Sequence, residues 1–259
     1  MTANSMQTQI NRFKQALRER QQIGMFSTLA SNTLVELFAG CGFDWILLDT
    51  EHSPNDLGEV IAQLQAMGRF EVSAIVRPAW SDMVLVKRLL DAGAQTLLFP
   101  SVQSAAEAAA AVSYTRYPPH GVRGVSGSSR AASYGLDADY LRNAQSELCV
   151  IVQIETVEAL RNLEAIAAVD GVDAVFIGPA DLAASMGHIG NGQHPEVQAA
   201  VDDAFARLRR IGMPAGYLTL NEAEAKRRIG EGVQMVGVAT DTSIIMRGAK
   251  GLLQRMAER

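Results

Sequence analysis

The sequence has few cysteines and no long hydrophobic runs, and each shortage excludes a class of protein. Cys41 and Cys149 are its only cysteines, too few for a disulfide framework. Cys149 lies among apolar residues, which predicts a buried structural thiol. No apolar run reaches the roughly 18 residues that cross a bilayer, and the first residues lack the basic and apolar parts of a secretion signal. We therefore expect a soluble, cytoplasmic protein with no membrane partner.

Positive charge is also scarce. The formal net charge is −5 and no run of lysines and arginines occurs, which argues against nucleic acid as a partner. None of the lysines follows a predicted strand, so a Schiff-base mechanism would have no amine. The lysines are Lys14, Lys87, Lys226 and Lys250.

What is present is a repeat of short apolar runs separated by segments with helical spacing. These runs show no alternation of apolar and polar residues, which is typical of strands covered on both faces. Eight such units in about 250 residues predict an α/β protein, a single (β/α)₈ barrel over residues 1–259 with a flexible segment at 1–12. The alternative is a doubly wound open sheet, but no Gly-x-Gly-x-x-Gly follows a strand. The predicted strands are Met25–Leu29, Trp45–Thr50, Ser73–Pro78, Thr96–Ser101, Leu148–Glu155, Ala174–Pro179, Pro214–Leu218 and Met235–Thr240.

The connection between the fourth and fifth predicted strands is unusually long. Its first part, Ser104–Tyr114, is rich in alanine and predicts a helix. The rest is rich in turn-forming residues and carries Arg116, Arg123 and Arg130. Long loops in compact domains are usually functional or disordered, and we expect this one to cover the substrate or to contact another subunit.

Polar residues gather where the predicted strands end, which is where barrel enzymes place their active sites. Glu155 and Asp181 end two strands that one crossover helix joins, so their carboxylates should lie side by side. Two such groups predict a site for a divalent cation such as Mg²⁺ or Mn²⁺. The alternative is a pair of ordinary strand-end acids that face water.

Histidine and arginine also occur at these strand ends. His52 is the only histidine predicted there, so we interpret it as a general base, although it could instead cap the following helix. Arg77 precedes Pro78 and could stabilise an oxyanion or pair with the nearby acids. His188 and His194 lie in a glycine-rich loop, and we interpret both as structural.

Several motifs together resemble one known family, the HpcH/HpaI aldolases. The resemblance covers nearly the whole chain from about residue 12, and its motifs occur in the family's order. They are Asp49-Thr-Glu-His52, Val-Arg77-Pro, Tyr-Pro-Pro-x-Gly-x-Arg-Gly-Val-Ser from Tyr117, Gln153-Ile-Glu155-Thr, Gly178-Pro-Ala-Asp181-Leu, Met-Gly-His188-x-Gly-Asn and His194-Pro-Glu-Val.

The resemblance implies a fold, an assembly and a set of site residues. It implies a (β/α)₈ barrel with an exchanged C-terminal helix, in a homohexamer built as a trimer of dimers. Glu155 and Asp181 would bind Mg²⁺, Mn²⁺ or Co²⁺. The pyruvate moiety would be held by Gln153 and by the backbone of Gly178, Pro179, Ala180 and Asp181. His52 would be the base, Arg77 would stabilise the transition state, and Asp91 would raise the basicity of His52; the residues alone leave Asp49 and Glu51 open as the partner of His52.

We therefore hypothesise a class II, metal-dependent aldolase that cleaves a 4-hydroxy-2-oxo acid to pyruvate and an aldehyde. The proposed substrate is 4-hydroxy-2-oxoheptanedioate, which would release succinate semialdehyde, and 2-dehydro-3-deoxyglucarate is the alternative. A decarboxylase of oxaloacetate-like acids, or a lyase acting on acyl-CoA esters, would share the enolate chemistry. A non-catalytic metabolite-binding barrel is the remaining alternative, but it predicts the loss of a metal ligand or of the base.

Overall fold

The eight predicted strands form one closed parallel barrel in the computed structural model, which describes residues 8–257. Each strand pairs with its successor, and β8 closes the barrel by pairing with β1. The predicted barrel is therefore confirmed, and the open sheet is excluded. The strands are β1 (Gln22–Ser27), β2 (Trp45–Asp49), β3 (Ser73–Arg77), β4 (Thr96–Phe99), β5 (Cys149–Ile154), β6 (Ala174–Ile177), β7 (Ala215–Leu218) and β8 (Met235–Thr240).

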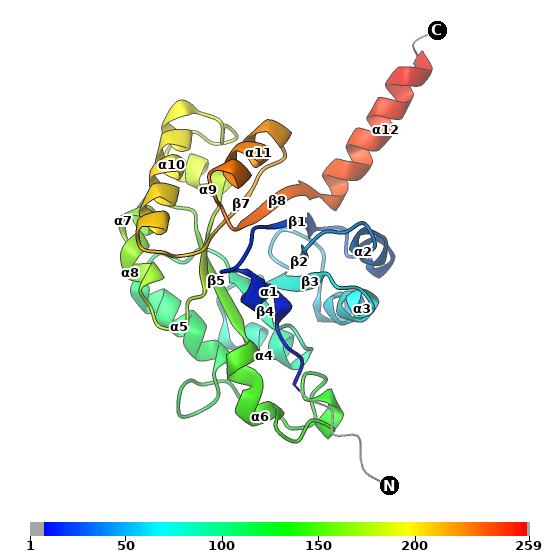
Figure 1. Ribbon diagram of the computed structural model, residues 1–259, viewed down its shortest axis with the longest axis vertical. Helices are drawn as coiled ribbons and strands as arrows, with labels where there is room; N and C mark the ends of the chain where they lie inside the picture. The colour runs from blue at the N-terminus through cyan, green and yellow to red at the C-terminus, as the bar shows by residue number, and fades with distance from the viewer. Residues whose placement is uncertain (1–7, 258–259) are drawn as a thin grey trace.

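Helices connect the strands and surround the barrel (Figure 1). They are α1 (Arg12–Ala16), α2 (Asn32–Ala39), α3 (Leu57–Met67), α4 (Met83–Asp91), α5 (Ala105–Thr115), α6 (Tyr140–Asn143), α7 (Val157–Arg161), α8 (Leu163–Ala167), α9 (Pro179–Ser185), α10 (Pro195–Arg210), α11 (Glu222–Gly230) and α12 (Asp241–Ala257), with 3₁₀ turns at Ser133–Gly135 and Ala144–Glu147. Among residues 8–257, no helix has both the length and the apolar character that a membrane crossing needs.

Local side-chain caps mark where the outer helices begin. The side chains of Ser31, Asp82 and Ser104 each accept a hydrogen bond from a backbone N–H in the first turn of α2, α4 and α5, respectively. Asp56 and Glu59 form a reciprocal capping box at the start of α3, which satisfies two backbone donors of its first turn. The alanine-rich segment predicted as a helix is α5.

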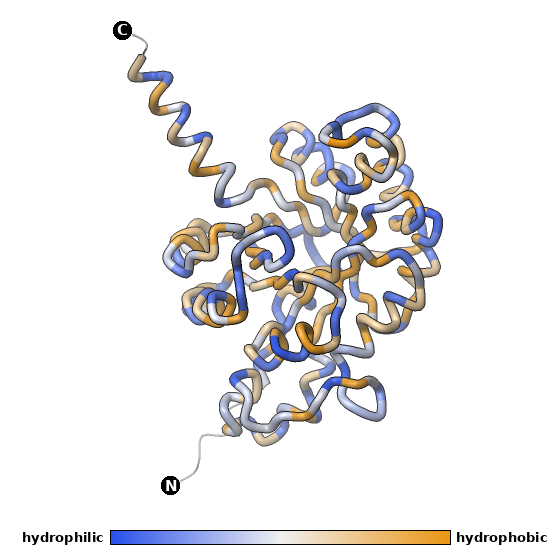
Figure 2. Tube along the Cα trace, turned by 180° about the vertical axis from the view of Figure 1, so that it is seen from behind, coloured by the Kyte–Doolittle hydropathy of each residue, from blue (hydrophilic) through white to orange (hydrophobic). Residues whose placement is uncertain are grey.

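The apolar core has two layers, one between strands and helices and one inside the barrel. In Figure 2, apolar residues run along the strands in the middle of the molecule. Inside the barrel the indole of Trp45, which is fully buried, occupies the space beside Gly24. A Cβ at Gly24 would come within 2.0 Å of that indole, so this glycine is required by packing. Phe13 and the residue after α1, Leu17, pack against the same inner layer.

The N-terminal segment predicted to be flexible lies partly outside the described residues, because 1–7 are not described. At the end of that segment, Asn11 is buried. Its side chain donates to Thr96 Oγ1 at 3.0 Å and to the carbonyl of Glu147 at 2.9 Å. Asn11 therefore ties the start of α1 to the amino end of β4 and to the segment that precedes β5.

The part of the long β4–β5 connection that follows α5 lies at the amino end of the barrel. Arg116 pairs with Asp170, just before β6, at 3.1 Å, and Arg130 donates to the carbonyl of Ala92, shortly before β4, at 2.8 Å. Arg123 is fully buried and donates to Asp91 at 2.8 Å. The part of this connection after α5 therefore does not cover the mouth of its own barrel, which is the end where the strands have their carboxyl ends, and its contact with another subunit stays a prediction.

The last helix, α12, leaves the barrel and projects from it (Figure 1). Asp241 at its start is buried and accepts hydrogen bonds from the backbone N–H groups of Thr28 and Leu29, which fixes the helix to the end of β1. Beyond this anchor the helix exposes a series of large apolar side chains. They are Ile245, Met246, Leu252, Leu253 and Met256.

Candidate active site

The carboxyl ends of β2 and β3 hold a buried ion pair. Asp49 and Arg77 are register partners in these strands, so their side chains emerge next to each other. Arg77 Nε and Nη2 donate to the two carboxylate oxygens of Asp49 at 2.8 and 2.7 Å. The guanidinium also lies over the ring of Phe26, 5.4 Å from its centre. Two parallel hydrogen bonds fix the plane of the guanidinium at the mouth of the barrel.

Glu51 links this pair to His52. One carboxylate oxygen of Glu51 lies 3.0 Å from Arg77 Nη1, and the other lies 3.8 Å from His52 Nε2. Burial raises the pKa of Glu51, although the charges of Arg77 and His52 act to lower it. The His52 side chain is 64% exposed. Within this chain, Glu51 is therefore the carboxylate that lies next to His52, the predicted base.

A tight turn sets the position of His52. The carbonyl of Asp49 accepts hydrogen bonds from Ser53 Oγ and, at 2.8 Å, from Asn55 Nδ2. These bonds fold the chain back immediately after β2, so Glu51 and His52 lie in a turn at the mouth of the barrel. The equivalent turn after β3 starts at buried Pro78 and carries Trp80, which is 58% exposed.

Glu155 is buried at the end of β5 and is held from two sides. One carboxylate oxygen accepts hydrogen bonds from Ser101 N and Oγ at 2.7 and 2.8 Å, and the other accepts from Gln153 Nε2. Ser101, just after β4, has a φ of +53°, a conformation that non-glycine residues seldom adopt. That strained backbone aims both of its donors at the carboxylate. The charge of Glu155 acts to raise the pKa of both Arg77 and Glu51.

The side chain of Gln153 keeps one free acceptor. Its Oε1 atom is buried and makes no hydrogen bond with the described residues. A buried amide oxygen without a partner costs free energy, so a ligand or cation that bound beside it would recover that cost.

Gly178 has no side chain, and Glu155 and Gln153 pack directly against it. Ile154 and Ile177 are register partners in β5 and β6, which brings the next residues, Glu155 and Gly178, together. A Cβ at position 178 would lie 2.8 Å from Glu155 Oε2 and 2.9 Å from Gln153 Nε2. Gly178 is also the N-cap of α9, in which Pro179 is the first residue and Asp181 the third. Ala180 and Asp181 are exposed, so the first turn of α9 faces solvent beside Glu155.

Asp91 is the predicted site residue that this chain does not bring to the mouth. It ends α4, shortly before β4 begins, and therefore lies at the amino end of the barrel. Its carboxylate accepts from Arg123, and the guanidinium of Arg123 lies over the ring of Tyr117, 4.6 Å from its centre. His52 is at the carboxyl end, so pairing of Asp91 with His52 would require the Asp91 of a second chain.

Two residues that hold the site did not stand out in the sequence. Ser101 lies two residues after the end of β4 at Phe99, and neither its left-handed backbone nor its link to Glu155 has a sequence signal. Glu51 was visible as one of several acids after β2, but its bridging position between Arg77 and His52 depends on the turn. The lysines all lie on helices and none follows a strand directly.

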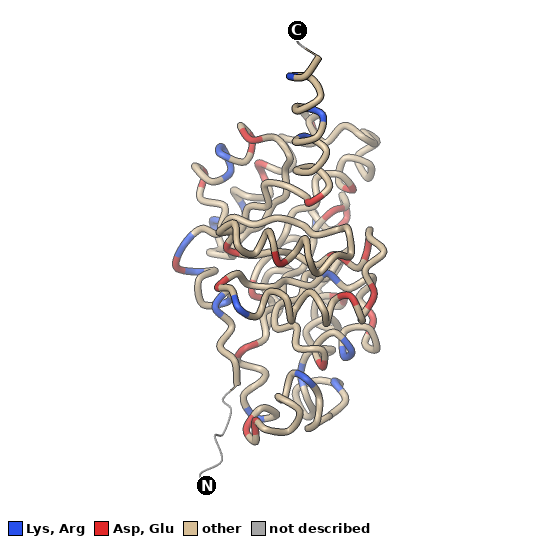
Figure 3. The backbone as a smooth tube through the Cα atoms, turned by 90° about the vertical axis from the view of Figure 1, so that its right-hand side faces the viewer, with Lys and Arg blue, Asp and Glu red and all other residues tan. Residues whose placement is uncertain are grey.

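A cavity of about 720 Å³ lies at the amino end of the barrel. The cations Lys14 and Arg116, which line it, are paired with Asp173 and Asp170. Over the side of the molecule in Figure 3, acidic and basic residues are interspersed. Arg18 and Arg142 also line the cavity, so its cations outnumber its two aspartates, but it holds none of the site residues predicted from the sequence, which lie at the carboxyl ends of the strands.

A closed parallel barrel that gathers a histidine, an arginine, an amide and several carboxylates at its carboxyl ends is a (β/α)₈-barrel enzyme. Comparison with known proteins narrows this class. Residues 22–247 match the sequence profile of HpcH/HpaI aldolase/citrate lyase. The chain belongs to this family, and it is a carbon–carbon lyase.

Individual relatives align over almost their whole length. The chain is 52% identical to a pyruvate aldolase of Rhizobium etli, with 97% of this chain and 100% of the relative covered. It is 53% identical to a 4-hydroxy-2-oxo-heptane-1,7-dioate aldolase of Klebsiella pneumoniae, with 95% and 93% covered. A crystal structure of an HpcH/HpaI aldolase/citrate lyase family protein from Burkholderia cenocepacia superposes with a TM-score of 0.93 at 39% identity, with 96% and 100% covered.

Proposed function

We propose that this protein is a divalent-metal-dependent pyruvate aldolase. It would cleave a 4-hydroxy-2-oxo acid such as 4-hydroxy-2-oxoheptanedioate to pyruvate and an aldehyde, here succinate semialdehyde, and would also run in reverse. The main observation in support is the buried carboxylate of Glu155 beside the free oxygen of Gln153, with both side chains packed against Gly178. Two of the relatives carry the names pyruvate aldolase and 4-hydroxy-2-oxo-heptane-1,7-dioate aldolase.

The residues at the mouth fit a hard divalent cation. One guanidinium, that of Arg77, faces the carboxylates of Asp49, Glu51 and Glu155, so negative charge is in excess. Oxygen ligands of this kind suit Mg²⁺, Mn²⁺ or Co²⁺, and Glu155 and Asp181 would hold the ion. The cation would supply positive charge for the carboxylate and 2-oxo oxygens of the substrate.

The side chains at the mouth would divide the remaining work. Gln153 would orient the pyruvate moiety through its amide, together with the backbone of the segment from Gly178 to Asp181. The first N–H groups of a helix have no partner within the helix, so those of Ala180 and Asp181 would donate to the bound acid. The absence of a side chain at Gly178 lets Glu155 and Gln153 keep their positions beside this helix start.

His52 would act as the base. It would take the proton of the 4-hydroxyl group as the C3–C4 bond breaks, so that an aldehyde leaves and the bonding electrons form the enolate of pyruvate. Arg77, held by Asp49 and Glu51, would keep a permanent positive charge near the enolate oxygen, where charge develops in the transition state. Return of a proton to C3 would give pyruvate.

Pyruvate release from candidate substrates tests the proposal. We expect pyruvate from 4-hydroxy-2-oxoheptanedioate or from 2-dehydro-3-deoxyglucarate with Mg²⁺ or Mn²⁺, and none after EDTA. The preferred substrate would identify the acceptor class. Activity unaffected by EDTA would contradict the metal site, and pyruvate released only from oxaloacetate would indicate a decarboxylase.

Replacement of His52 tests the base in the same assay. We expect His52→Ala to lower kcat by about 10²–10⁴-fold, the usual contribution of a general base, while Mn²⁺ affinity stays unchanged. The matched control is His120→Ala, because His120 is exposed and lies in the connection at the amino end. Full activity of His52→Ala would show that another group takes the proton.

The quaternary structure implied by the resemblance is part of the proposal. A homohexamer built from three dimers that exchange the C-terminal helix would cover the apolar side chains of α12. Assembly would also be needed if Asp91 is to reach a His52, since the two lie at opposite ends of one barrel.

A further inference from the structure

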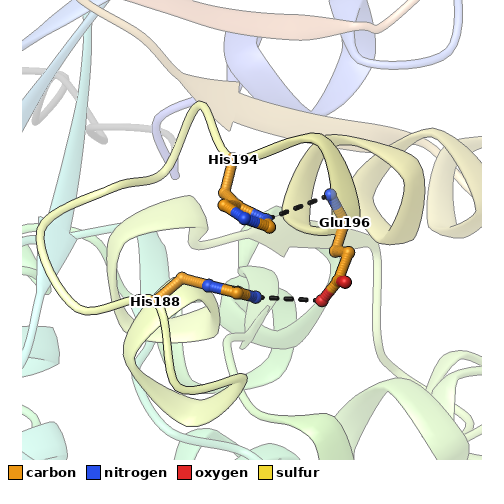
Figure 4. Close-up of side chains that lie close together, drawn as sticks. All are labelled: His188, His194 and Glu196. Carbon is orange, nitrogen blue, oxygen red and sulfur yellow. Dashed lines mark hydrogen bonds and ion pairs between the residues drawn. The ribbon is translucent and has the colours of Figure 1, made fainter.

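The loop between α9 and α10 brings together three potential metal ligands that the aldolase mechanism does not use. His188 Nε2 lies 3.0 Å from Glu196 Oε2, and His194 Nδ1 accepts a hydrogen bond from the backbone N–H of Glu196 at 3.3 Å. The two imidazole rings stack, with centres 3.6 Å apart and planes 14° from parallel. In Figure 4 both rings direct a nitrogen toward Glu196.

The ligand atoms already lie within the range that a metal ion can join. One nitrogen from each histidine and one oxygen of Glu196 all lie within 4.8 Å of one another, and among the described residues this is the one group of three or more His, Cys, Asp or Glu that does so. Zinc–nitrogen bonds are about 2.0–2.1 Å long, so ligands on one ion lie about 3.3 Å apart. Small rotations of these side chains, which would move the two stacked rings apart, would bring the three ligand atoms to that separation.

The chemistry of these ligands differs from that of the mouth. Imidazole suits Zn²⁺, Cu²⁺ and Ni²⁺, whereas an all-oxygen set suits Mg²⁺ and Mn²⁺. A backbone N–H can only donate, so Nδ1 of His194 accepts this hydrogen bond with its lone pair, which points toward the backbone nitrogen of Glu196. A metal ligand needs such a lone pair. A metal at this point would replace the 3.3 Å hydrogen bond and would displace the proton that His188 shares with Glu196 to Nδ1 or to solvent.

We propose that His188, His194 and Glu196 form a second metal site, selective for a borderline-soft cation such as Zn²⁺ and distinct from the site of Glu155 and Asp181. The three ligands come from a glycine-rich loop and from the first turn of a long helix, α10. One coordination position is left for water, because zinc takes four ligands.

The site would brace one wall of the mouth. Gly192, in the same loop, lies against Pro179: a Cβ built on it would be 3.6 Å from the Pro179 carbonyl oxygen. Its own carbonyl accepts from Gln198 on α10 at 2.7 Å. A metal that joins both ends of the loop would hold this contact and, with it, the first turn of α9 beside Glu155.

Zinc binding to the full-length protein tests the proposal. Purified metal-free protein is titrated with Zn²⁺ against a chromogenic chelator, with and without a large excess of Mg²⁺. We expect one Zn²⁺ per chain to remain bound in excess Mg²⁺. We expect the same for Glu155→Gln, whose mouth site is impaired. Absence of bound Zn²⁺ in excess Mg²⁺, or its loss in Glu155→Gln, would overturn the proposal.

Variants of the cluster complete the test. His188→Gln and His194→Gln should each weaken Zn²⁺ binding by more than about tenfold, since even changes behind a metal ligand cost 10–100-fold. Glu196→Gln keeps the size of the side chain and the backbone N–H, and should also weaken binding. His120→Gln is the matched control and should bind as the parent does. Circular dichroism confirms that each variant is folded, and equal Zn²⁺ affinity in the cluster variants and the control would refute the site.

Discussion

Arg77 is shared between two carboxylates of different burial. Asp49 is 1% exposed and accepts two hydrogen bonds from the guanidinium, whereas Glu51 is 13% exposed and forms an ion pair with its Nη1. A buried carboxylate is stable only when it is paired and hydrogen-bonded, and the fork of a guanidinium can serve both acids at once. The hydrogen bond and charge of Asp49, with Glu51 and Glu155, raise the pKa of Arg77 against the opposing effect of its burial. Arg77 therefore stays charged beside these carboxylates.

Glu51 gives the molecule a pH dependence of stability. Because burial raises its pKa, the folded chain binds this proton more tightly than the unfolded chain does. The stabilisation is complete below the ordinary glutamate pKa and is lost as the pH rises through the raised value. We expect the Tm of the parent to fall relative to that of Glu51→Gln across this interval, measured in EDTA by thermal unfolding at a series of pH values.

A matched charge change controls that experiment. Glu71 is exposed on the outside of the barrel, and Glu71→Gln removes one negative charge without touching the mouth. Its Tm difference from the parent should stay flat over the interval. A parallel Tm profile for the parent and Glu51→Gln would show that Glu51 does not titrate differently in the folded state.

Single residues were predictable where their chemistry is rare. His52, Arg77 and Glu155 could be chosen from the sequence because few charged groups follow apolar strands. Ser101 could not, since its role depends on a positive φ and on the register of β4 and β5. The assignment of Asp91 came from the resemblance alone, and within one chain its partner is Arg123.

The start of α9 shows how one element can shape a site by what it omits. Gly178 caps the helix without a side chain, and the side chains of Glu155 and Gln153 occupy the place where its Cβ would be. Any larger residue would have to move a buried carboxylate whose other oxygen is fixed by Ser101.

Gly178→Ala should therefore displace Glu155 and weaken the metal site. The added methyl carbon would meet Glu155 Oε2 at 2.8 Å and Glu155 Cβ at 3.0 Å, closer than packed atoms tolerate. We expect a loss of Mn²⁺ affinity of at least about tenfold, by analogy with changes behind metal ligands, measured by electron paramagnetic resonance of free Mn²⁺. Gly192→Ala is the control, because its Cβ would meet its nearest neighbour at an ordinary 3.6 Å. Equal Mn²⁺ affinity in the two variants would argue against a metal beside Glu155.

Element positions were easier to predict than their surroundings. Each predicted strand overlaps its observed strand, and β8 agrees at both ends, because buried parallel strands are continuous apolar runs. The long connection after α5 resisted prediction: its arginines marked it as functional, yet their partners at the amino end are set by tertiary packing. The exposure of the apolar side chains of α12 could likewise not be predicted, because it depends on the helix leaving the barrel.

At the scale of the whole molecule, α12 leaves an apolar surface on a projecting helix. Isolated helices gain most of their stability from tertiary packing, and exposed apolar patches mark protein contacts. Leu252 and Leu253 are 51% and 69% exposed near its end. A second subunit that packed on these side chains would remove them from water.

Replacing both leucines by aspartate should therefore reduce the size of the assembly. We expect Leu252→Asp/Leu253→Asp to lower the mass measured by light scattering after size-exclusion chromatography, because two buried charges would oppose association. Lys250→Asp, on the same helix, is the control, because it changes the charge at a position that is already polar. It should leave the mass of the assembly unchanged. If the double variant kept the parent's mass, α12 would lie outside the subunit contacts.

The placement of the two tryptophans gives the protein two built-in optical probes. Trp45 is sealed inside the barrel, and its emission should be blue-shifted until the barrel opens. Trp80 is exposed to solvent three positions after Arg77, and its emission should change when a ligand enters the mouth of the barrel. Trp80→Phe would leave the first signal alone, and Trp45→Phe the second, so that unfolding and ligand entry can be followed separately in one chain without a dye.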